Sequence, residues 1–328
     1  MSTPYLHVEN LSRDFKAQGR KVRAVDNVSF DIPVGTTFSL VGESGCGKTT
    51  LARVIAGLDL PSSGSLVFGG PADGRVQRTQ MIFQDPYASL NPRWRVGDAI
   101  AESITFQKLR PPAEVKQRVE ELLVRVGLAA ADAAKFPHEF SGGQRQRISI
   151  ARALAGEPSF LVCDEPTSAL DVSVQAQILN LLKRLEKEEG LTSLFISHNL
   201  AVVRFVSSMI GVMYLGRLVE VAPTAELFAA PRHPYTQLLL EAVPRIGQGR
   251  RMVSLPAGEL PSPLAPPPGC TFHPRCPIAM DICRTVAPAL LPVAHGASVA
   301  CHAVNAEEQV LHFMPVAAQS ARIHLQPV

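Results

Sequence analysis

The most informative stretch of this sequence is Gly42-Glu43-Ser44-Gly45-Cys46-Gly47-Lys48-Thr49-Thr50, which fits the pattern G-x-x-x-x-G-K-[ST]. It follows the apolar, strand-like run 38–41 and precedes the helix-like run 51–56, the strand–loop–helix context that the pattern requires. Glycines let the backbone turn tightly, so that successive N–H groups point at phosphate oxygens near the positive end of the following helix. Lys48 would reach the β- and γ-phosphates, and the Thr49 hydroxyl would bind Mg²⁺. The stretch therefore predicts a nucleoside triphosphate site, against the alternative of a glycine-rich turn without a ligand.

Length, charge and hydropathy limit the class of protein. The 328 residues are enough for two domains, and 32 basic residues against 29 acidic ones give a net charge of +3, too small to indicate a broad nucleic-acid footprint. No apolar run reaches the roughly 18 to 20 residues needed to cross a bilayer; the most apolar part, 202–215, is interrupted by Arg204. Residues 1–9 lack the basic and apolar regions of a secretion signal. We expect a cytoplasmic chain that reaches a membrane only through a partner.

The first hundred residues have the pattern of a mixed α/β protein. Loose alternation with turn residues predicts short antiparallel strands over 5–34, where Phe15 is either a core residue or an aromatic ring that stacks on adenine. Further strands are expected at 66–70 and 80–83, the second ending on Gln84. Polar side chains at the carboxyl ends of strands face ligands in α/β proteins. From about 91 to 158 the apolar spacing becomes helical, which predicts a helical insertion.

A second anion site is a candidate within that insertion. The segment Phe140-Ser141-Gly142-Gly143-Gln144 opens a helix that Ser141 can cap, and two glycines leave the amino end of this helix bare enough to meet a phosphate. The alternative is a capped helix with a flexible lead-in.

Acidic and histidine side chains end the next two strands. The apolar run 160–163 ends on Asp164 and Glu165, and the run 193–197 ends on His198. A buried strand does not end on two acids for packing reasons, because each would need a partner or exposure. Beside the phosphate loop, Asp164 is the expected Mg²⁺-side acid and Glu165 a candidate base for the attacking water. A helix between the two strands would make a βαβ unit that brings Glu165 and His198 to one edge of the sheet.

These motifs, in this order, strongly resemble the ATP-binding subunits of ABC transporters over roughly residues 5–230. The resemblance rests on the phosphate loop, Gln84 of the Q-loop, the signature segment 140–144, the Asp164-Glu165 pair, the D-loop 168–171 and the switch His198. More narrowly, 83–93 and Arg232-His233-Pro234-Tyr235-Thr236 are similar to the oligopeptide/dipeptide importers, in their F-type ATPase subunit. The implied fold is α/β: a RecA-like ATPase core with an antiparallel β subdomain and a helical insertion at about 87–158, forming a domain over 1–230, with a C-terminal extension over 231–328.

The resemblance also implies roles for single residues. Two such domains close head to tail, so Ser141, Gly143 and Gln144 would serve the ATP on the partner's phosphate loop. Phe15, where the family more often has tyrosine, would stack on adenine. Asp164, Thr49 and Gln84 would bind Mg²⁺, and Gln84 would also sense the γ-phosphate. The catalytic set would be Glu165, His198, Lys48 and Gln84, with Glu165 polarising water and His198 holding the γ-phosphate.

Four cysteines follow a proline-rich linker that includes Pro256 and 261–268, which cannot be helical. Their spacing is Cys270-x5-Cys276-x6-Cys283-x17-Cys301. In a reducing compartment four thiolates indicate a metal site rather than disulfides. The lack of a C-x2-C pair weakens the case for zinc and leaves an iron–sulfur cluster open, with no metal as a third alternative. The importer ATPases that the chain resembles carry a [4Fe-4S] cluster in such a region, and these four cysteines match its ligand pattern.

The resemblance implies an ATPase that drives import of peptides or a related small solute, at the cytoplasmic face of the membrane. Its partners would be a second ATPase subunit in a heterodimer, two transmembrane permease subunits and an extracytoplasmic solute-binding protein, with no nucleic acid. The permease would contact 87–95, including Trp94, unless that tryptophan belongs to the subdomain core. The alternatives are a soluble ABC-type ATPase that acts on nucleic acid or ribosomes, and an exporter ATPase.

Overall fold

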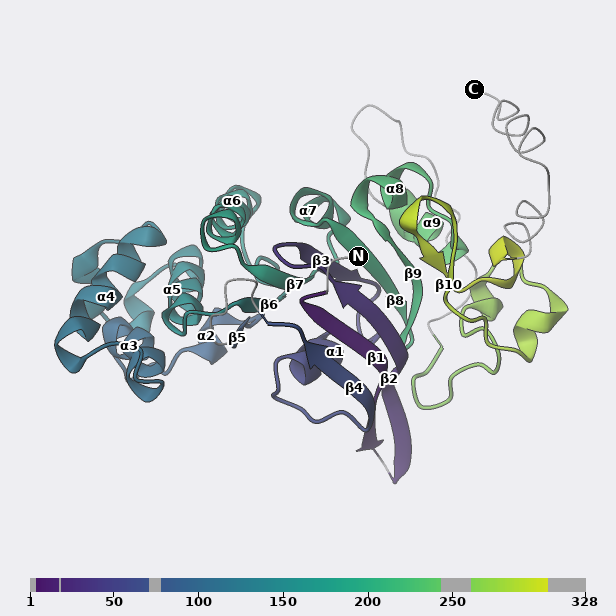
Figure 1. Cartoon of the computed structure of the whole chain (residues 1–328), viewed down its shortest axis with the longest axis horizontal. Helices are drawn as coiled ribbons and strands as arrows, with labels where there is room; N and C mark the ends of the chain where they lie inside the picture. Colours follow the sequence, from purple (N-terminus) through teal and green to yellow (C-terminus); the bar gives the residue numbers. More distant parts are fainter. Residues whose placement is uncertain (1–3, 18, 71–77, 243–260, 306–328) are drawn as a thin grey trace.

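A computed structural model of the chain describes residues 4–17, 19–70, 78–242 and 261–305 (Figure 1). Pro256 of the predicted linker lies outside the described residues. Within the described ranges, none of the helices has both the length and the apolar character needed to span a bilayer.

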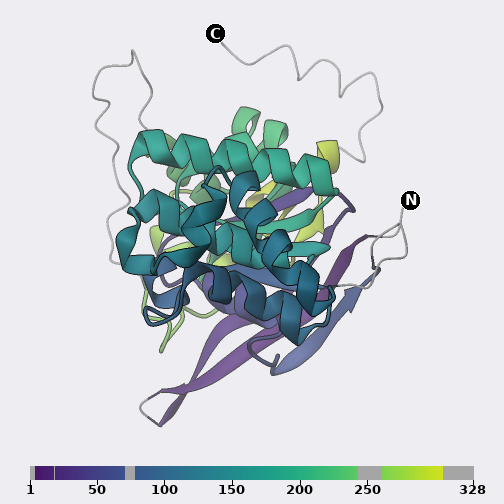
Figure 2. The same ribbon diagram turned by 90° about the vertical axis from the view of Figure 1, so that its left-hand side faces the viewer.

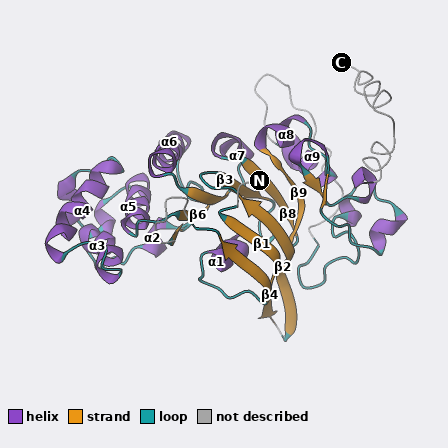
Figure 3. Ribbon diagram, viewed as in Figure 1, coloured by secondary structure: helices purple, strands orange, loops and turns teal. Residues whose placement is uncertain are grey.

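A large mixed sheet forms the centre of the structure (Figure 3), and in the described part of the chain its strand order is β10-β11-β9-β8-β3-β7-β6-β5. From β8 to β5 neighbouring strands are parallel, while β9, β10 and β11 pair antiparallel. The strands are β3 (Thr37–Val41), β5 (Thr79–Ile82), β6 (Phe160–Asp164), β7 (Thr192–Ile196), β8 (Met209–Tyr214), β9 (Arg217–Pro223), β10 (Leu291–Pro292) and β11 (Ser298–Val299).

Helices cover both faces of this sheet, with α1 on one side and α6, α7 and α8 on the other (Figure 1). The strand β3 shows why the run 38–41 is apolar throughout. Phe38 and Leu40 pack into the core that contains α1, whereas Val41 packs into the core that contains α7. A parallel strand buried on both faces needs apolar residues at successive positions. The helices are α1 (Lys48–Ile55), α6 (Val172–Glu189), α7 (Leu200–Val206), α8 (Thr224–Ala229) and α9 (Pro234–Glu241).

A three-stranded antiparallel sheet, ordered β2-β1-β4, packs against α1. Its strands are β1 (Leu6–Ala17), β2 (Arg20–Ile32) and β4 (Ser63–Phe68). The predicted antiparallel subdomain is confirmed, but β1 and β2 are 12 and 13 residues long rather than short. Of the turn residues that suggested interruptions, Asp26 and Asn27 lie at a bulge, where the register between β1 and β2 shifts and the strands continue, and residues 33–35 follow the end of β2.

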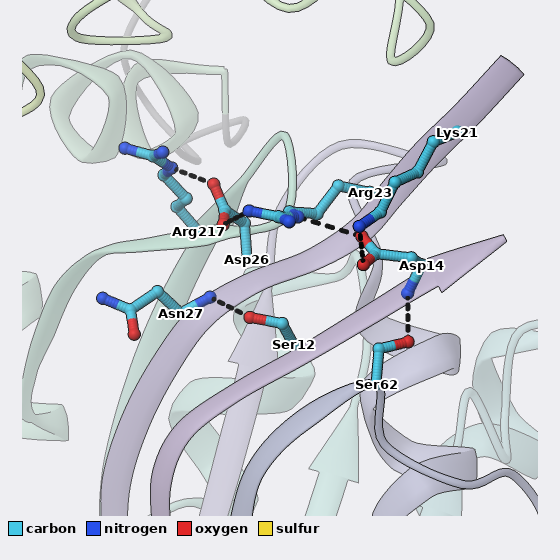
Figure 4. Close-up of polar contacts among 8 residues, drawn as sticks. All are labelled: Ser12, Asp14, Lys21, Arg23, Asp26, Asn27, Ser62 and Arg217. Atoms are coloured by element: carbon cyan, nitrogen blue, oxygen red, sulfur yellow. Dashed lines mark hydrogen bonds and ion pairs between the residues drawn. The ribbon is translucent and has the colours of Figure 1, made fainter.

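Polar contacts fix this smaller sheet to the larger one (Figure 4). The guanidinium of Arg217, in β9, donates to Asp26 at 2.6 Å, and Arg23 joins Asp26 to Asp14 across β2 and β1. Lys21 lies 2.7 Å from the same Asp14 carboxylate. Burial raises the pKa of Asp14, but hydrogen bonds from Lys21 and Arg23 outweigh it and hold the pKa below its usual value. The sheet that carries Phe15 therefore has a fixed position beside the central strands.

The predicted helical insertion is a group of helices at one end of the molecule (Figure 1), the end that faces the viewer in Figure 2. They are α2 (Pro86–Ser89), α3 (Val96–Phe106), α4 (Pro112–Arg125) and α5 (Gly142–Ala155). In α4 the helically spaced apolar residues Val119, Leu122 and Leu123 are buried in the core of this group, and Gly127 follows the end of the helix with a φ of 80°.

The C-terminal extension is built onto the same sheet. The short strand β11 pairs with β9, and β10 pairs with β11. Phe272 is fully buried between Tyr214 of β8 and Tyr235 of α9, with ring centroids 5.3 and 5.4 Å away. The two sequence regions on either side of residue 230 thus share one sheet and one aromatic core.

A buried polar pair starts this extension. The carboxylate of Glu220, in β9, accepts the backbone N–H groups of Arg232 and His233, and His233 Nδ1 accepts the N–H of Tyr235 at the start of α9. Burial raises the pKa of Glu220, although its hydrogen bonds oppose this, and burial lowers the pKa of His233 to about 3. His233 is therefore neutral in the folded chain at neutral pH and acts as the helix cap.

The His233 pKa predicts a loss of stability in acid. Because the unfolded chain binds this proton below pH 6.5 and the folded chain only near pH 3, the free energy of unfolding should fall as the pH drops, by up to about 1.4 kcal/mol per pH unit from this group. His233→Asn keeps an acceptor for the Tyr235 N–H, so urea unfolding at about pH 7 and about pH 5 should show a smaller fall in the variant than in the wild type.

Two comparisons make this test specific. Glu220 acts in the opposite direction, because its raised pKa favours the protonated folded state, so only the difference between variant and wild type reports on His233. A His138→Gln variant, at an exposed position, should behave like the wild type. An equal loss of stability in the wild type and in His233→Asn would contradict the assignment.

Candidate functional site

The loop 42–49 turns around two glycines that no other residue can replace. At Gly42, with φ 151°, a Cβ would lie 2.2 Å from the carbonyl oxygen of Met213, and at Gly47, with φ 106°, 2.1 Å from that of Ala24. Both separations are far below van der Waals contact, and both φ angles are in the range that favours glycine. The loop therefore lies directly on the backbones of β8 and β2.

Lys48 lies inside this loop. Its ammonium group donates to the carbonyl oxygens of Gly42 and Glu43 at 2.8 and 2.9 Å, and its side chain is buried. A primary ammonium held at the centre of a glycine-rich loop is placed to bind phosphate oxygens.

Thr49 and Asp164 meet where the loop joins the sheet. The Thr49 hydroxyl donates to Asp164 Oδ1 at 3.1 Å. Burial raises the pKa of Asp164, the hydrogen bond from Thr49 lowers it, and the charge of Glu165 raises it again. A hydroxyl and a carboxylate side by side are hard oxygen donors of the kind that Mg²⁺ takes, and a cation would relieve the cost of the buried charge. The two residues fit the predicted Mg²⁺ site.

Three of the predicted catalytic side chains meet around one carboxylate. Gln84 Nε2 donates to Glu165 Oε2 at 3.0 Å, and His198 Nδ1 lies 3.2 Å from Glu165 Oε1. They come from the ends of β5, β6 and β7, as the sequence predicted. Glu165 has a φ of 46°, an unusual conformation for a residue with a side chain, and its N–H donates to Ile196. Such strain occurs where the surrounding structure holds a functional group in a fixed direction.

Phe15 lies near the carboxyl end of β1, the central strand of the smaller sheet, opposite Val22 of β2. Its side chain is 37% exposed, and the Arg13 guanidinium lies 4.7 Å from its ring centroid. The ring is accessible for stacking, which is the role predicted for it.

The signature residues Ser141, Gly143 and Gln144 lie away from the phosphate loop of their own chain. Ser141 caps α5, where its hydroxyl accepts the Gln144 N–H while its own N–H donates to the Gln144 side chain. A Cβ at Gly143 would lie 2.5 Å from the Val174 side chain of α6, so this glycine also has a packing role. Because α5 belongs to the helical group at the end of the molecule (Figure 1), the structure does not bring these residues to the loop of their own chain.

The surface next to Gln84 is open. Tyr87 and Trp94 are exposed, Trp94 to 40%, and the Arg145 guanidinium lies 3.8 Å from the Tyr87 ring centroid. Trp94 is thus not enclosed in the core of the helical group.

The four C-terminal cysteines lie in the same part of the extension, although 31 positions separate the first from the last in the chain. The Cys270 N–H donates to the Cys283 carbonyl at 2.8 Å. Burial, with a smaller contribution from the charges of the other three thiols, raises the pKa of the Cys276 thiol to about 11, so all four thiols lie within electrostatic range of one another. The thiols are free, and among the described residues no three Cys, His, Asp or Glu side chains are close enough to hold one metal ion. The structure thus places the four thiols near one another, but it does not show them in a geometry in which they bind a metal.

Sequence patterns missed several residues that contact the loop. Glu43 bonds to Tyr235 and to Arg275, both in the C-terminal extension. Sequence patterns also missed a contact to a different loop, the D-loop. Gln175 of α6 donates to the carbonyl oxygens of Thr167 and Leu170 and so fixes that loop. Tyr235 belongs to a recognised family motif, but nothing in that motif indicates the loop as its partner.

Two family models match the chain. The model described as ABC transporter matches residues 25–168, and the model described as oligopeptide/dipeptide transporter, C-terminal region, matches residues 219–283.

Individual relatives give the same result over most of the chain. A probable peptide ABC transporter ATP-binding protein of Sinorhizobium fredii is 46% identical over 98% of this chain and 95% of its own. The oligopeptide transport ATP-binding protein AppF of Bacillus subtilis is 47% identical over 88% of this chain and 92% of its own. A solved dimeric ATP-binding cassette, in a post-hydrolysis state bound to ADP and Pi, superposes with a TM-score of 0.60 at 28% identity, over 67% of this chain and 98% of that chain. A subunit of an ABC transporter complex from Clostridium perfringens superposes with the same score at 29% identity, over 70% and 92%.

The geometry predicts that a change at Glu165 affects ATP hydrolysis but not ATP binding. Glu165→Gln keeps the shape of the side chain but removes its basicity, so ATP hydrolysis should fall by about 100-fold or more, the usual contribution of a general base, while ATP affinity stays near that of the wild type. Steady-state hydrolysis and equilibrium ATP binding measure the two quantities. The exposed Glu114→Gln in α4 is the control, and unimpaired turnover in Glu165→Gln would remove the assigned base.

Proposed function

The chain belongs to the ATP-binding subunits of ABC transporters, in their oligopeptide/dipeptide importer branch, and we propose that it binds and hydrolyses ATP at the site described above to drive peptide import. The observation that carries this proposal is the meeting of the phosphate loop, the Thr49–Asp164 pair and the Gln84–Glu165–His198 group at one edge of the sheet.

The phosphate loop and its lysine bind the nucleotide. Lys48 and the N–H groups around it would hold the β- and γ-phosphates, and the accessible ring of Phe15 would stack on adenine. Mg²⁺, when bound, neutralises charge on the β- and γ-phosphate oxygens, and Thr49, Asp164 and Gln84 are the residues that would hold it.

Hydrolysis is assigned to the residues around Glu165. The Glu165 carboxylate takes a proton from the water that attacks the γ-phosphorus, as the bond between the β,γ-bridging oxygen and that phosphorus breaks. The contacts with Gln84 and His198 orient this carboxylate, and the His198 imidazole is exposed and can donate to the γ-phosphate. Water and ATP become ADP and phosphate.

The second half of each site comes from another chain. Ser141, Gly143 and Gln144 lie in the helical group, away from their own loop, so they would contact the ATP on a partner's loop in a head-to-tail dimer. ATP would then favour the closed dimer, and hydrolysis would release it. We propose that the partner is a second, different ATPase subunit.

The remaining partners follow from the family. They are the permease subunits in the membrane and a substrate-binding protein, which place this chain at the cytoplasmic face. We assign the permease contact to the open surface at Tyr87 and Trp94, because large exposed aromatic side chains are favoured at protein interfaces. Cross-linking from a Trp94→Cys variant to the permease measures this contact, and its absence in an assembled importer would contradict the assignment.

An ATPase that acts on nucleic acid or ribosomes is not supported. The importer-type C-terminal region is matched over 219–283, and a net charge of +3 provides no basic footprint. That match also favours import over export.

For the cysteines we propose a [4Fe-4S] cluster held by Cys270, Cys276, Cys283 and Cys301. Four cysteine thiols within electrostatic range of one another are the donor set that such clusters take, and the raised pKa values of Cys270 and Cys276 mean that binding must release protons from these two thiols. Zinc is the alternative, since it also binds four thiolates.

The spectrum of the purified chain tests this cluster. Anaerobically prepared protein should be brown, with absorbance at about 400 nm and iron and sulfide in stoichiometric amounts. The Cys276→Ser variant should lose this absorbance and the bound iron and sulfide. Cys46→Ser, in the phosphate loop, is the matched control. A colourless preparation with one zinc would support the alternative.

The proposed dimer is tested with hydrolysis blocked. A Glu165→Gln chain mixed with its companion ATPase subunit and ATP should form a stable closed dimer in light scattering, because the γ-phosphate joins the two halves of each site. Adding Ser141→Arg should abolish that dimer without preventing ATP binding to the chain's own loop, whereas Val124→Arg, at an exposed site in the same helical group, should not. A chain that stays solitary with ATP and its cognate companions would overturn the proposal.

A further inference from the structure

The phosphate loop has a partner in the C-terminal extension. Both terminal nitrogens of the Arg275 guanidinium contact the Glu43 carboxylate, Nη1 to Oε2 at 2.9 Å and Nη2 to Oε1 at 3.0 Å. Glu43 is the second residue of the loop, and Arg275 ends a 3₁₀ turn, His273–Arg275, 232 positions later. The Arg275 side chain is 8% exposed and that of Glu43 is 23% exposed, so water screens this pair less than a surface ion pair. A two-point contact of this kind fixes direction as well as distance.

Aromatic side chains hold both members of the pair. The Tyr235 hydroxyl accepts the backbone N–H of Glu43 at 2.9 Å, and Arg275 Nη1 lies 3.4 Å from the Tyr214 hydroxyl. The guanidinium also lies near the rings of Tyr214 and Phe272, 5.8 and 5.9 Å from their centroids. Both tyrosines and Phe272 are fully buried, so their ring positions are fixed by packing.

Glu43 therefore connects the extension to the phosphate-binding lysine. Its N–H and its carboxylate are bonded to the extension, while its carbonyl oxygen accepts from Lys48 at 2.9 Å. A displacement of Glu43 would move an acceptor that sets the position of the Lys48 ammonium group. Without Arg275, the Glu43 carboxylate would also remain as an unneutralised negative charge beside the site for phosphate.

The loop and the extension also border a common cavity. A cavity of about 690 Å³ is lined by Gly45 of the loop, by Val22 and Ala24 of β2, and by residues of the linker and extension, among them Pro266 and Thr271. Val22 is the residue paired with Phe15 across the strands. The extension thus borders the loop at both Glu43 and Gly45.

We propose that Arg275 is a positioning residue for ATP binding: through Glu43 it holds the phosphate loop and neutralises the loop's only carboxylate, so nucleotide affinity depends on the C-terminal extension. This rests on the ATP use proposed above. Arg275 acts through Glu43, so its loss changes ATP affinity and KM more than it changes kcat.

Equilibrium ATP binding to the full chain measures this effect. Arg275→Met should weaken ATP binding about tenfold, equivalent to about 1.4 kcal/mol, with KM rising in parallel and kcat falling less than twofold. Arg275→Lys keeps the charge but loses the two-point contact, so it should bind ATP with intermediate affinity. Arg125→Met, which breaks an ion pair with Glu188 and Glu189 in the helical region, is the matched control and should bind ATP like the wild type.

A double-variant cycle separates positioning from general damage. If Arg275 acts through Glu43, Glu43→Gln combined with Arg275→Met should bind ATP no more weakly than Arg275→Met alone. If the losses of ATP affinity in the two single variants multiply in the double variant, the two residues act independently, and that result would overturn the inference. Glu43→Gln and Arg275→Lys keep the test decisive even when Arg275→Met does not fold, because unchanged ATP affinity in both would also overturn it.

The outcomes for this inference and for the proposed function are distinguishable. A wild-type chain that binds no ATP contradicts the proposed function. A wild-type chain that binds ATP, with an Arg275→Met variant that binds it equally tightly, contradicts only the role of Arg275.

Discussion

Parallel pairing of β3, β7 and β6 is the constraint on which the site depends. Leu40 and Asp164 both pair with Ile196, so the ends of the three strands lie in one row. At the same edge of the sheet, β3 continues into the phosphate loop, β6 into Glu165 and β7 into the turn that carries His198. A shift of one residue in this register would turn every strand-end side chain to the other face. The catalytic contacts are therefore a consequence of the register, and the burial of both faces of the sheet fixes that register.

The loop itself is held by close backbone packing. Gly42 and Gly47 leave no room for a Cβ against β8 and β2, so the loop is pressed onto strands from both sheets. The contacts of Asp26 with Arg217 and Gly216 join the same two regions. Binding of a highly charged ligand benefits from such a fixed loop, because less conformational freedom remains to be lost when the ligand binds.

The C-terminal extension is a structural part of this site. It adds β11 and β10 to the central sheet, buries Phe272 between tyrosines of β8 and α9, and places Arg275 on the loop. Arg275 also immediately precedes Cys276 in the chain. Arg275 and the four cysteines therefore lie in one segment, 270–301, whereas Tyr235, another residue of the extension that contacts the loop, follows the neutral, buried His233 at the start of α9.

The sequence by itself determined the phosphate loop, the strand ends that carry Gln84, Asp164, Glu165 and His198, and the capped signature helix, because each depends on local spacing and on residue types with few alternative uses. It also predicted the α/β class and the helical insertion from periodicity. Only the tertiary structure decided that Arg275 and Tyr235 contact Glu43, that the extension continues the central sheet and that Trp94 is exposed. These contacts join residues far apart in the chain, and no local pattern encodes which distant segments the packing of the core will bring together.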